Sequence, residues 1–448
     1  MKKKVLSALL SVSMLSTLLA GCGASQAGDS ATASSQAAAS AASSAPAATA
    51  AATSAAAATS TASASGDYDL TLYTIQSTDT DFSDWLSRAE AGTGLKINVI
   101  AAPTDSDTRQ QKITTVLSTG DTSVDIIEIN DEMATSFKNT GWLAPLSDTV
   151  MTQDVVSNMS ASGYITDMLT NTSGQIIGVP TYQGYLALWV NQKIMDEVGI
   201  KEINTKEDLM NYIKKASGNG RYGYGGSWEK TYVFNEIAEF VYLFGGDYFD
   251  WTKQGNRDAL QFMHDMVTNG ETPIDQIADK YEQMNQKFND GKYGCVFMWG
   301  TGSDYKAADM LGDDKIHQIN IPVFSGDKAS IFTDSWSYVE NAATTHKDAC
   351  EKFLKWACSD DGYKAGWDDF DRYPATKTGV AAAVPDDNWV KTAYTEYAEK
   401  DNVHGRPMLP QTMEYITDIG TIFQDYVQDK ISLDDFCTKA QEYVKECQ

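Results

Sequence analysis

From residue 67 onward the chain alternates short apolar runs with amphipathic segments. In residues 82–91, apolar side chains recur at the helical spacing i, i+3, i+4 and i+7. Residues 124–129 (VDIIEI) form a near-continuous apolar run, which is typical of a strand covered on both faces. This alternation predicts a doubly wound parallel sheet at the start of the folded body. Its expected elements are strands at 69–75, 95–101 and 124–129 and helices at 82–91, 108–118 and 131–139.

The rest of the body continues as a mixture of strands and helices. Residues 176–180 (IIGVP) and 186–191 (LALWVN) predict two strands around a turn. Thr205 and Asp208 have the spacing of a capping box, so a helix is expected to begin there and to run to residue 216. Further extended segments are expected at 294–299 and 331–339, and further helices at 192–198, 233–244, 257–268, 284–290, 347–359, 413–428 and 433–446.

The first 66 residues differ from this body. Lysines at positions 2–4 precede a mostly apolar stretch, 5–19, that is too short to span a bilayer as a stable helix. The small pair Ala20-Gly21 then leads to Cys22, and this ending resembles the lipobox of bacterial lipoproteins. The resemblance implies that residues 1–21 are a signal peptide and that Cys22 carries diacylglycerol, a lasting two-chain anchor. The alternative is an ordinary signal peptide followed by a chance cysteine.

The segment after Cys22 is almost wholly Ala, Ser and Thr up to about Gly66. It has almost no charge and no large apolar side chain, so it cannot bury enough surface to offset the entropy of ordering. We therefore interpret residues 22–66 as a lipidated cysteine and a disordered tether that holds a folded body away from a membrane.

Composition limits the partners of the body. It has about 380 residues, so two domains are expected rather than one core. The formal net charge of −26 argues against nucleic acid, whose phosphates require Lys and Arg, and it favours a neutral ligand. No long apolar run follows the signal segment.

Cysteines, histidines and acidic clusters do not form metal motifs. Beyond Cys22 there are five cysteines, and a Cys437–Cys447 disulfide stays open at this stage. The four histidines are scattered without ligand-like spacing, so neither a metal nor a cofactor is expected. The clusters at 79–81 and 368–371 lack the spacing of a calcium loop, and we interpret them as solvated turns.

Five segments of the body, in this order, resemble the extracellular solute-binding proteins that serve ABC importers of sugars, a family typified by the maltose-binding protein. The resemblance covers essentially the whole body, although none of its motifs is highly specific alone. The segments are 124–146 (VDIIEINDEMATSFKNTGWLAPL), 174–200 (GQIIGVPTYQGYLALWVNQKIMDEVGI), 288–299 (FNDGKYGCVFMW), 334–357 (DSWSYVENAATTHKDACEKFLKWA) and 405–446.

The resemblance implies an α/β fold of two lobes, each a doubly wound sheet flanked by helices, with ligand in the cleft between them. Three chain crossings are implied, near 179–181, 332–334 and 376–379. Closure is then a hinge motion around the ligand. Lobe one is expected at 67–179 plus 335–378, and lobe two at 180–334 plus 379–448.

Aromatic and polar residues follow the ends of the expected strands or lie at the implied crossings. Ligands of open α/β sheets sit beyond the carboxyl ends of the strands. A pyranose suits these residue types, because rings cover its apolar face while carboxylates, amides and guanidinium groups bond its hydroxyls. The predicted ligand-binding residues are Gln76, Asp79, Asp131, Glu132, Tyr182, Gln183, Trp228, Trp299, Asp334, Trp336, Arg372 and Arg406.

Several of these residues also have a purely structural interpretation. The three tryptophans at 228, 299 and 336 end strands or lie in loops, but each could instead belong to the core. The role of Asp131 could be limited to stabilising the N-terminus of its helix, by capping and by interaction with the helix dipole. Arg406 could tie its loop to a carboxylate.

The sequence thus predicts a lipid-anchored, monomeric solute-binding protein on the outer face of a cell membrane, with a neutral sugar or oligosaccharide as ligand and ABC importer permease subunits as partners. It predicts contact with the membrane only through the lipid anchor, and none with nucleic acid. One alternative is a surface glycoside hydrolase with a carboxylate pair. Another is a subunit that presents its ligand to a sensor. The sequence has no nucleophile elbow, Cys–His pair, phosphate loop or metal motif that would favour an enzyme.

Overall fold

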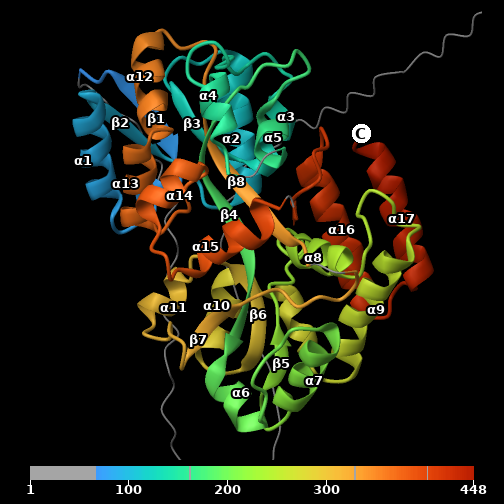
Figure 1. Ribbon diagram of the computed structural model, residues 1–448. Coiled ribbons are helices and arrows are strands. Elements are labelled where there is room, and N and C mark those ends of the chain that lie inside the picture. Colours follow the sequence, from blue (N-terminus) through green and yellow to red (C-terminus); the bar gives the residue numbers. More distant parts are fainter. Residues whose placement is uncertain (1–66, 161–162, 327–328, 401) are drawn as a thin grey trace, which may run out of the picture. The chain divides into compact units, whose positions relative to one another are not determined.

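The computed structural model describes residues 67–448 apart from 161–162, 327–328 and 401 (Figure 1). The predicted signal peptide, Cys22 and the tether lie outside the described residues. Within the described part, no helix is long and apolar enough to cross a membrane.

A parallel three-stranded arrangement begins the body. Strand β1 (Leu70–Thr74) pairs in parallel with β2 (Ile97–Ala101) on one side and with β3 (Ile126–Asn130) on the other. The connecting helices are α1 (Phe82–Thr93) and α2 (Ser106–Thr119), and α3 (Asp131–Phe137) follows β3 directly. The predicted strands and helices of this region are confirmed to within a few residues at each end.

Two long strands, β4 (Val179–Asn191) and β8 (Ile331–Glu340), link this sheet to the rest of the body (Figure 1). β8 pairs antiparallel with β3 and with the first half of β4. The second half of β4 pairs with β6 (Tyr293–Trp299) and β7 (Ile316–Ile319), and β5 (Tyr222–Gly225) pairs in parallel with β6. The strand order is β2-β1-β3-β8-β4-β6-β5.

The prediction of two strands around a turn at 176–191 is wrong, because one continuous strand occupies this region. Tyr182, Gln183 and Gly184 resemble a turn in sequence, yet they keep their register against β8 after an irregularity at Pro180. The Gln183 side chain is buried, where Ser160 Oγ donates to its Oε1 and its Nε2 donates to Thr333. These buried hydrogen bonds hold the polar segment extended where it passes between the two parts of the sheet.

Helices complete the body around two main groups of core residues. We call lobe one the elements around β1–β3, and lobe two the elements around β5, β6 and the second half of β4. The predicted residue boundaries of the lobes stay predictions.

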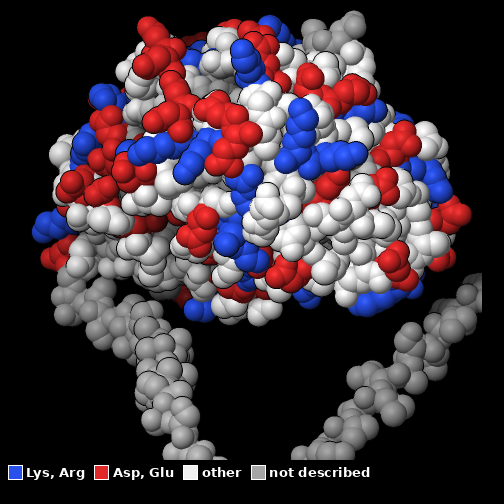
Figure 2. Space-filling model, turned by 90° about the horizontal axis from the view of Figure 1, so that it is seen from below, with Lys and Arg blue, Asp and Glu red and all other residues white. Residues whose placement is uncertain are grey.

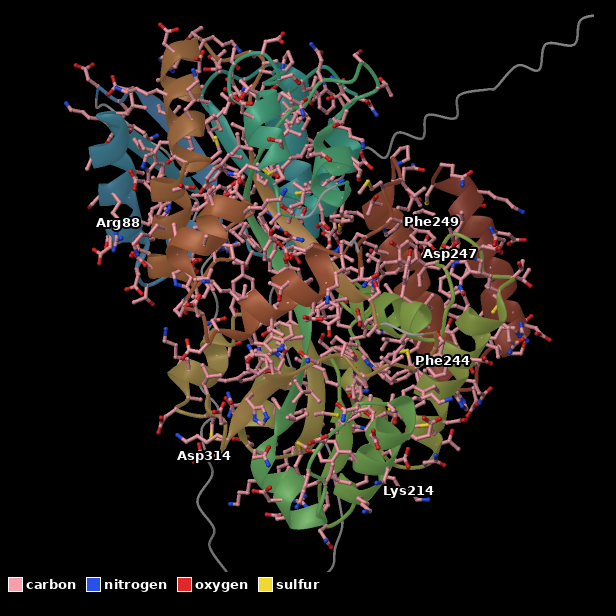
Figure 3. All side chains as sticks on the ribbon, viewed as in Figure 1. Arg88, Lys214, Phe244, Asp247, Phe249 and Asp314 are labelled. Carbon is pink, nitrogen blue, oxygen red and sulfur yellow. The ribbon has the colours of Figure 1, made fainter. Side chains whose placement is uncertain are left out.

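In Figure 3, charged side chains such as Arg88 and Lys214 lie at the periphery of these lobes. The remaining helices are α4 (Gln153–Ser157), α5 (Tyr164–Leu169), α6 (Gln192–Val198), α7 (Lys206–Ala216), α8 (Phe234–Leu243), α9 (Gln254–Thr268), α10 (Tyr281–Asn289), α11 (Ser303–Ala307), α12 (Lys347–Ala357), α13 (Asp360–Phe370), α14 (Lys377–Ala383), α15 (Trp389–Ala393), α16 (Thr412–Val427) and α17 (Leu433–Glu446).

The predicted start of α7 is confirmed. The Thr205 side chain accepts a hydrogen bond from the Asp208 backbone N–H, and the Asp208 carboxylate accepts one from the Thr205 N–H. This reciprocal pair satisfies two of the free N–H groups at the helix start.

The described cysteines are all unbonded, so Cys437 and Cys447 carry free thiols in this structure. Among residues 67–448 outside the three gaps, no cluster of His, Cys, Asp and Glu has the geometry of a metal site. On the face shown in Figure 2, acidic and basic side chains are interleaved.

Candidate functional site

A cavity of about 390 Å³, here called the main cavity, opens where β4 and β8 pass the end of β6. Segments far apart in the sequence form its walls: the loop after β1, the middle of β4 and β8, the end of β6, and the end of α13 with the residues after it. Five of the twelve predicted residues line it, namely Asp79, Tyr182, Trp299, Asp334 and Arg372. The other lining residues are Thr80, Asp81, Gly184, Met298, Gly300, Thr301, Ser303, Asp369, Phe370, Asp371 and Tyr373.

Aromatic rings, carboxylates and one guanidinium group share the wall of the main cavity. The Arg372 guanidinium carbon lies 4.2 Å from the ring centroid of Tyr182, within cation–π distance. Arg372 Nη1 is buried and has no hydrogen-bond partner in the protein, and the same is true of Asp334 Oδ1. Unpaired buried polar atoms are rare in folded proteins, and both of these atoms belong to side chains that line the cavity.

The environment of Asp334 is unusual for a carboxylate. Burial, together with nearby Asp131, raises the pKa of Asp334 to about 7, although Arg406 and Arg372 act in the opposite direction. Gly184 lies opposite on β4, and a Cβ atom at that position would collide with Asp334 Oδ1. A residue without a side chain at 184 therefore leaves room for this carboxylate.

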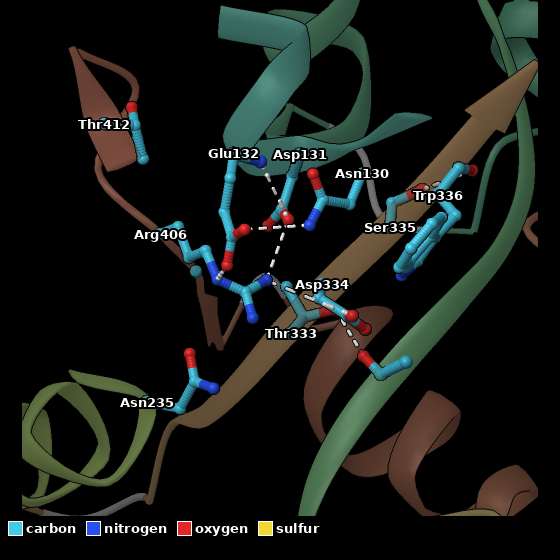
Figure 4. A network of polar contacts seen from close by, with 12 residues as sticks. Asn130, Asp131, Glu132, Asn235, Thr333, Asp334, Ser335, Trp336, Arg406 and Thr412 are labelled. Atoms are coloured by element: carbon cyan, nitrogen blue, oxygen red, sulfur yellow. Dashed lines mark hydrogen bonds and ion pairs between the residues drawn. The ribbon is translucent and has the colours of Figure 1, made fainter. Parts of the chain in front are cut away.

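Beside the main cavity, Arg406 forms a buried network that we call the Arg406 bridge (Figure 4). Its Nη1 lies 2.7 Å from Asp131 Oδ1, and its Nε lies 2.8 Å from Glu132 Oε1. Its Nη1 is also 4.0 Å from Asp334 Oδ2. Asp131 and Glu132 begin α3, which packs in the core of lobe one, whereas Arg406 precedes α16, which packs in the core of lobe two. The bridge thus ties the two cores together.

Neighbouring hydrogen bonds fix the acidic side of the bridge. Asn130 Oδ1 accepts from the Met133 N–H at the start of α3, and Asn130 Nδ2 donates to Glu132 Oε2 over 2.9 Å. Tyr164 Oη donates to Asp131 Oδ2 over 2.7 Å and accepts from the Arg406 backbone N–H. Three of the predicted ligand contacts, Asp131, Glu132 and Arg406, are therefore paired with one another and are absent from the wall of the main cavity.

Three further predicted residues lie near the main cavity but do not line it. Gln76 is buried and donates to Glu128 Oε1 over 3.3 Å, and Gln183 is held in the strand pair described above. The Trp336 ring is flanked by two guanidinium groups, with Arg109 Cζ at 5.0 Å and Arg372 Cζ at 6.0 Å from its centroid. These three side chains contact residues around the cavity but are not part of its wall.

Trp228, also predicted as a ligand contact, packs in the core in this structure and does not line the main cavity. It has no exposed surface, its ring packs edge-on against Phe423 at 5.1 Å, and its Nε1 donates to Glu236 Oε2 over 3.0 Å. Burial raises the pKa of Glu236 to about 7, although hydrogen bonds from Tyr224, Ser227 and Trp228 lower it.

The end of α13 and Asp371 belong to the wall but were not predicted, although Arg372, the next residue, was. Residues 360–370 (DDGYKAGWDDF) contain two glycines and four acidic residues, and this segment is not among the predicted helices. The Ser359 side chain caps this helix by accepting from the Gly362 N–H, and Asp371, with φ of 53°, ends it. Asp369, Phe370 and Asp371 are thereby presented to the cavity, and Asp81, also interpreted as part of a solvated turn, lines it as well. Ser359 followed by two aspartates was the available signal.

An α/β body whose central strands run through two cores, with a polar and aromatic cavity between them, has the architecture of a two-lobed binding protein. The chain belongs to the family of bacterial extracellular solute-binding proteins, whose model matches residues 74–364. The predicted family and fold class are confirmed. The chain is 24% identical over 280 residues to an arabinooligosaccharide-binding protein of Halalkalibacterium halodurans, an alignment that covers 58% of this chain and 60% of the relative.

Solved structures of such proteins share the fold. Maltose-bound MalE3 of T. maritima has a TM-score of 0.71 at 18% identity and covers 85% of this chain and 99% of its own. A solute-binding protein from Thermotoga lettingae bound with α-D-tagatose has a TM-score of 0.70 at 18% identity, covering 84% of this chain and 99% of its own. A Listeria monocytogenes ABC substrate-binding protein in complex with cycloalternan has a TM-score of 0.69 at 16% identity, covering 84% and 98%.

Proposed function

We propose that the chain is a non-catalytic binding protein that captures a neutral sugar or oligosaccharide in the main cavity and delivers it to an ABC importer. The main cavity carries this proposal. The rings of Tyr182, Trp299 and Tyr373 are suited to pack against the apolar faces of a sugar. The side chains of Asp334 and Arg372, which can bond sugar hydroxyls, each have one polar atom without a partner in the protein. The names of the relatives support the ligand class, since they describe binding of arabinooligosaccharide, maltose and cycloalternan.

A thermal-shift screen tests the ligand class. The purified protein is mixed with arabinooligosaccharides, maltooligosaccharides, hexoses and polyols, with peptides and polyamines as the contrasting set. A ligand that binds only the native state stabilises it by RT ln(1 + [L]/Kd), about 2.7 kcal/mol at a hundredfold excess over Kd. We expect a shift with at least one saccharide. A shift with peptides or polyamines alone contradicts the proposal.

Two substitutions test whether the saccharide binds in the main cavity. Above pH 7, where Asp334 is mostly ionised, Asp334→Asn removes a charged acceptor and Arg372→Lys displaces a charged donor, so we expect each to weaken saccharide binding by about tenfold or more. The matched controls are Asp258→Asn on the exposed face of α9 and Arg257→Lys, whose Arg257 pairs with Asp434 at the surface. Equal affinities for the two sets of variants would place the sugar elsewhere.

We also propose that the protein is a monomer held by a lipid on Cys22 at the outer face of the cell membrane. The apolar stretch 5–19 and the sequence Leu18-Leu19-Ala20-Gly21-Cys22 support the lipid anchor. Metabolic labelling of producing cells with a tagged fatty acid should label the protein, and the label should be lost in Cys22→Ser together with retention in the membrane fraction. A Cys22→Ser protein that still takes up the labelled fatty acid would rule out this anchor.

A further inference from the structure

The wall of the main cavity carries more negative than positive charge. Five carboxylates line it, whereas Arg372 is the only positively charged side chain among the described residues of the wall. With all five ionised, the wall has a formal charge of −4, because five negative charges meet one positive charge. The carboxylates come from the loop after β1, from β8 and from the end of α13 with the residue after it, and they are those of Asp79, Asp81, Asp334, Asp369 and Asp371.

The positive charge of Arg372 is shared among several carboxylates. Burial raises the pKa of Asp79 and of Asp334, and Arg372 acts in the opposite direction on both. Arg372 also opposes the effect of burial on the pKa of Glu128, a buried carboxylate outside the wall. One guanidinium group cannot neutralise three carboxylates, so the wall keeps a negative potential.

Two cations outside the wall compensate only part of the remaining charge. Arg88 Nη2 lies 3.2 Å from Asp369 Oδ1, and Lys306 Nζ lies 3.3 Å from Asp371 Oδ2. The side chains of Arg88 and Lys306 are 47% and 65% exposed, so water weakens both pairs. Even if both cations are counted in full, the negative charges around the cavity outnumber the positive ones.

The two aspartates after β1 have no such compensation. Asp79 and Asp81 are exposed, and among the described residues neither of them forms an ion pair. They flank Thr80, which also lines the cavity. This loop therefore presents two uncompensated negative charges to a molecule bound in the main cavity.

We propose that the main cavity selects sugars by charge, accepting neutral and amino-substituted sugars and rejecting sugars that carry a carboxylate or a phosphate group. The proposal rests on the proposed function and deepens it, because it adds a cationic class of ligand and assigns the exclusion of anions chiefly to Asp79 and Asp81. An ammonium group in place of a hydroxyl still donates hydrogen bonds, and the wall attracts its charge. A carboxylate would lose hydration beside like charges, which weakens its binding.

Calorimetric titration with one saccharide in three charge states tests this selection. The probes are maltotriose and arabinotriose, each with the primary hydroxyl of its non-reducing end unchanged, oxidised to a carboxylate or replaced by an amino group. The titrations are done slightly above pH 7, where Asp334 is mostly ionised. For the saccharide that binds, we expect the carboxylate form to bind about tenfold or more weakly than the unchanged form, and the amino form to bind at least as tightly as the unchanged form.

The possible failures of this experiment are distinguishable. Equal affinities of the carboxylate and unchanged forms overturn the charge selection and leave the proposed function intact. An amino form that binds more weakly than the unchanged form also overturns the charge selection, because the modification itself then interferes with binding. No binding of any form overturns both proposals.

Asparagine variants test whether the loop after β1 causes the selection. Asp79→Asn combined with Asp81→Asn removes two charges from the wall at exposed positions. The ratio of the Kd of the carboxylate form to that of the unchanged form should fall by about three- to tenfold in this variant. Added salt should lower the same ratio in the unchanged protein, because exposed charges are screened. The matched control, Asp258→Asn combined with Asp265→Asn on the exposed face of α9, removes the same charge and should leave the ratio as it is. A cavity variant whose ratio equals that of the control overturns the proposal.

Discussion

Replacing Arg406 with alanine should lower the free energy of unfolding by about 3–5 kcal/mol, as is typical when one partner of a buried ion pair is removed. Arg406 is 8% exposed and pairs with Asp131 and Glu132, which are 2% and 6% exposed. Without the guanidinium group, two adjacent carboxylates stay buried with no positive partner. Denaturant unfolding followed by tryptophan fluorescence measures the change.

Two comparisons make this result specific to the Arg406 bridge. Arg257→Ala breaks a surface ion pair with Asp434 and should have little effect, because exposed pairs contribute little. Adding Asp131→Asn and Glu132→Gln to Arg406→Ala removes the stranded charges and should restore part of the lost stability. If Arg406→Ala unfolds like Arg257→Ala, the bridge does not hold the two cores together.

Trp228→Ala should also lower the free energy of unfolding by about 3–5 kcal/mol, the cost of emptying a fully buried aromatic site. The indole fills space against Phe423 and donates to Glu236, so alanine creates a cavity and removes one hydrogen bond from a buried carboxylate. The same unfolding experiment measures the loss. Trp142→Ala, at a half-buried position, should cost less.

Sugar binding separates a core role for Trp228 from a ligand role. Trp228→Phe keeps a ring in the core, so the folded variant should bind saccharide with an affinity close to that of the unchanged protein. A Trp228→Phe protein of normal stability that no longer binds any saccharide would show that the sequence-based assignment was right and the core role wrong.

Local patterns were enough to predict most of the fold. The strands around Leu72 and Ile127 and the helix from Phe82 to Ala89 follow from patterns of residues that are close in the sequence. The observed strands and helices lie where these patterns place them. The strand through Gln183 was missed because its extended form depends on Ser160 and on β8, which are distant in sequence. Helix α13 was missed because its cap, Ser359, outweighs its unfavourable composition.

The lining of the main cavity was predictable where it depends on strand ends. Asp79, Tyr182, Trp299 and Asp334 follow or end strands or lie at the implied crossings, and they reach one cavity for that reason. Pairing between distant side chains was not predictable. No local pattern shows that Arg406 is already neutralised by the two carboxylates at the start of α3.

The central claim is that the main cavity holds an unmodified sugar, and calorimetric titration with recovery of the ligand tests it most directly. The purified protein is titrated with arabinooligosaccharides and with maltooligosaccharides, and the bound sugar is then released and its mass determined. We predict one sugar bound per chain, recovered with unchanged mass, and binding at least tenfold weaker in Asp334→Asn, the cost of about one charge-assisted hydrogen bond. No binding to any saccharide, or recovery of shortened sugars, would contradict the account.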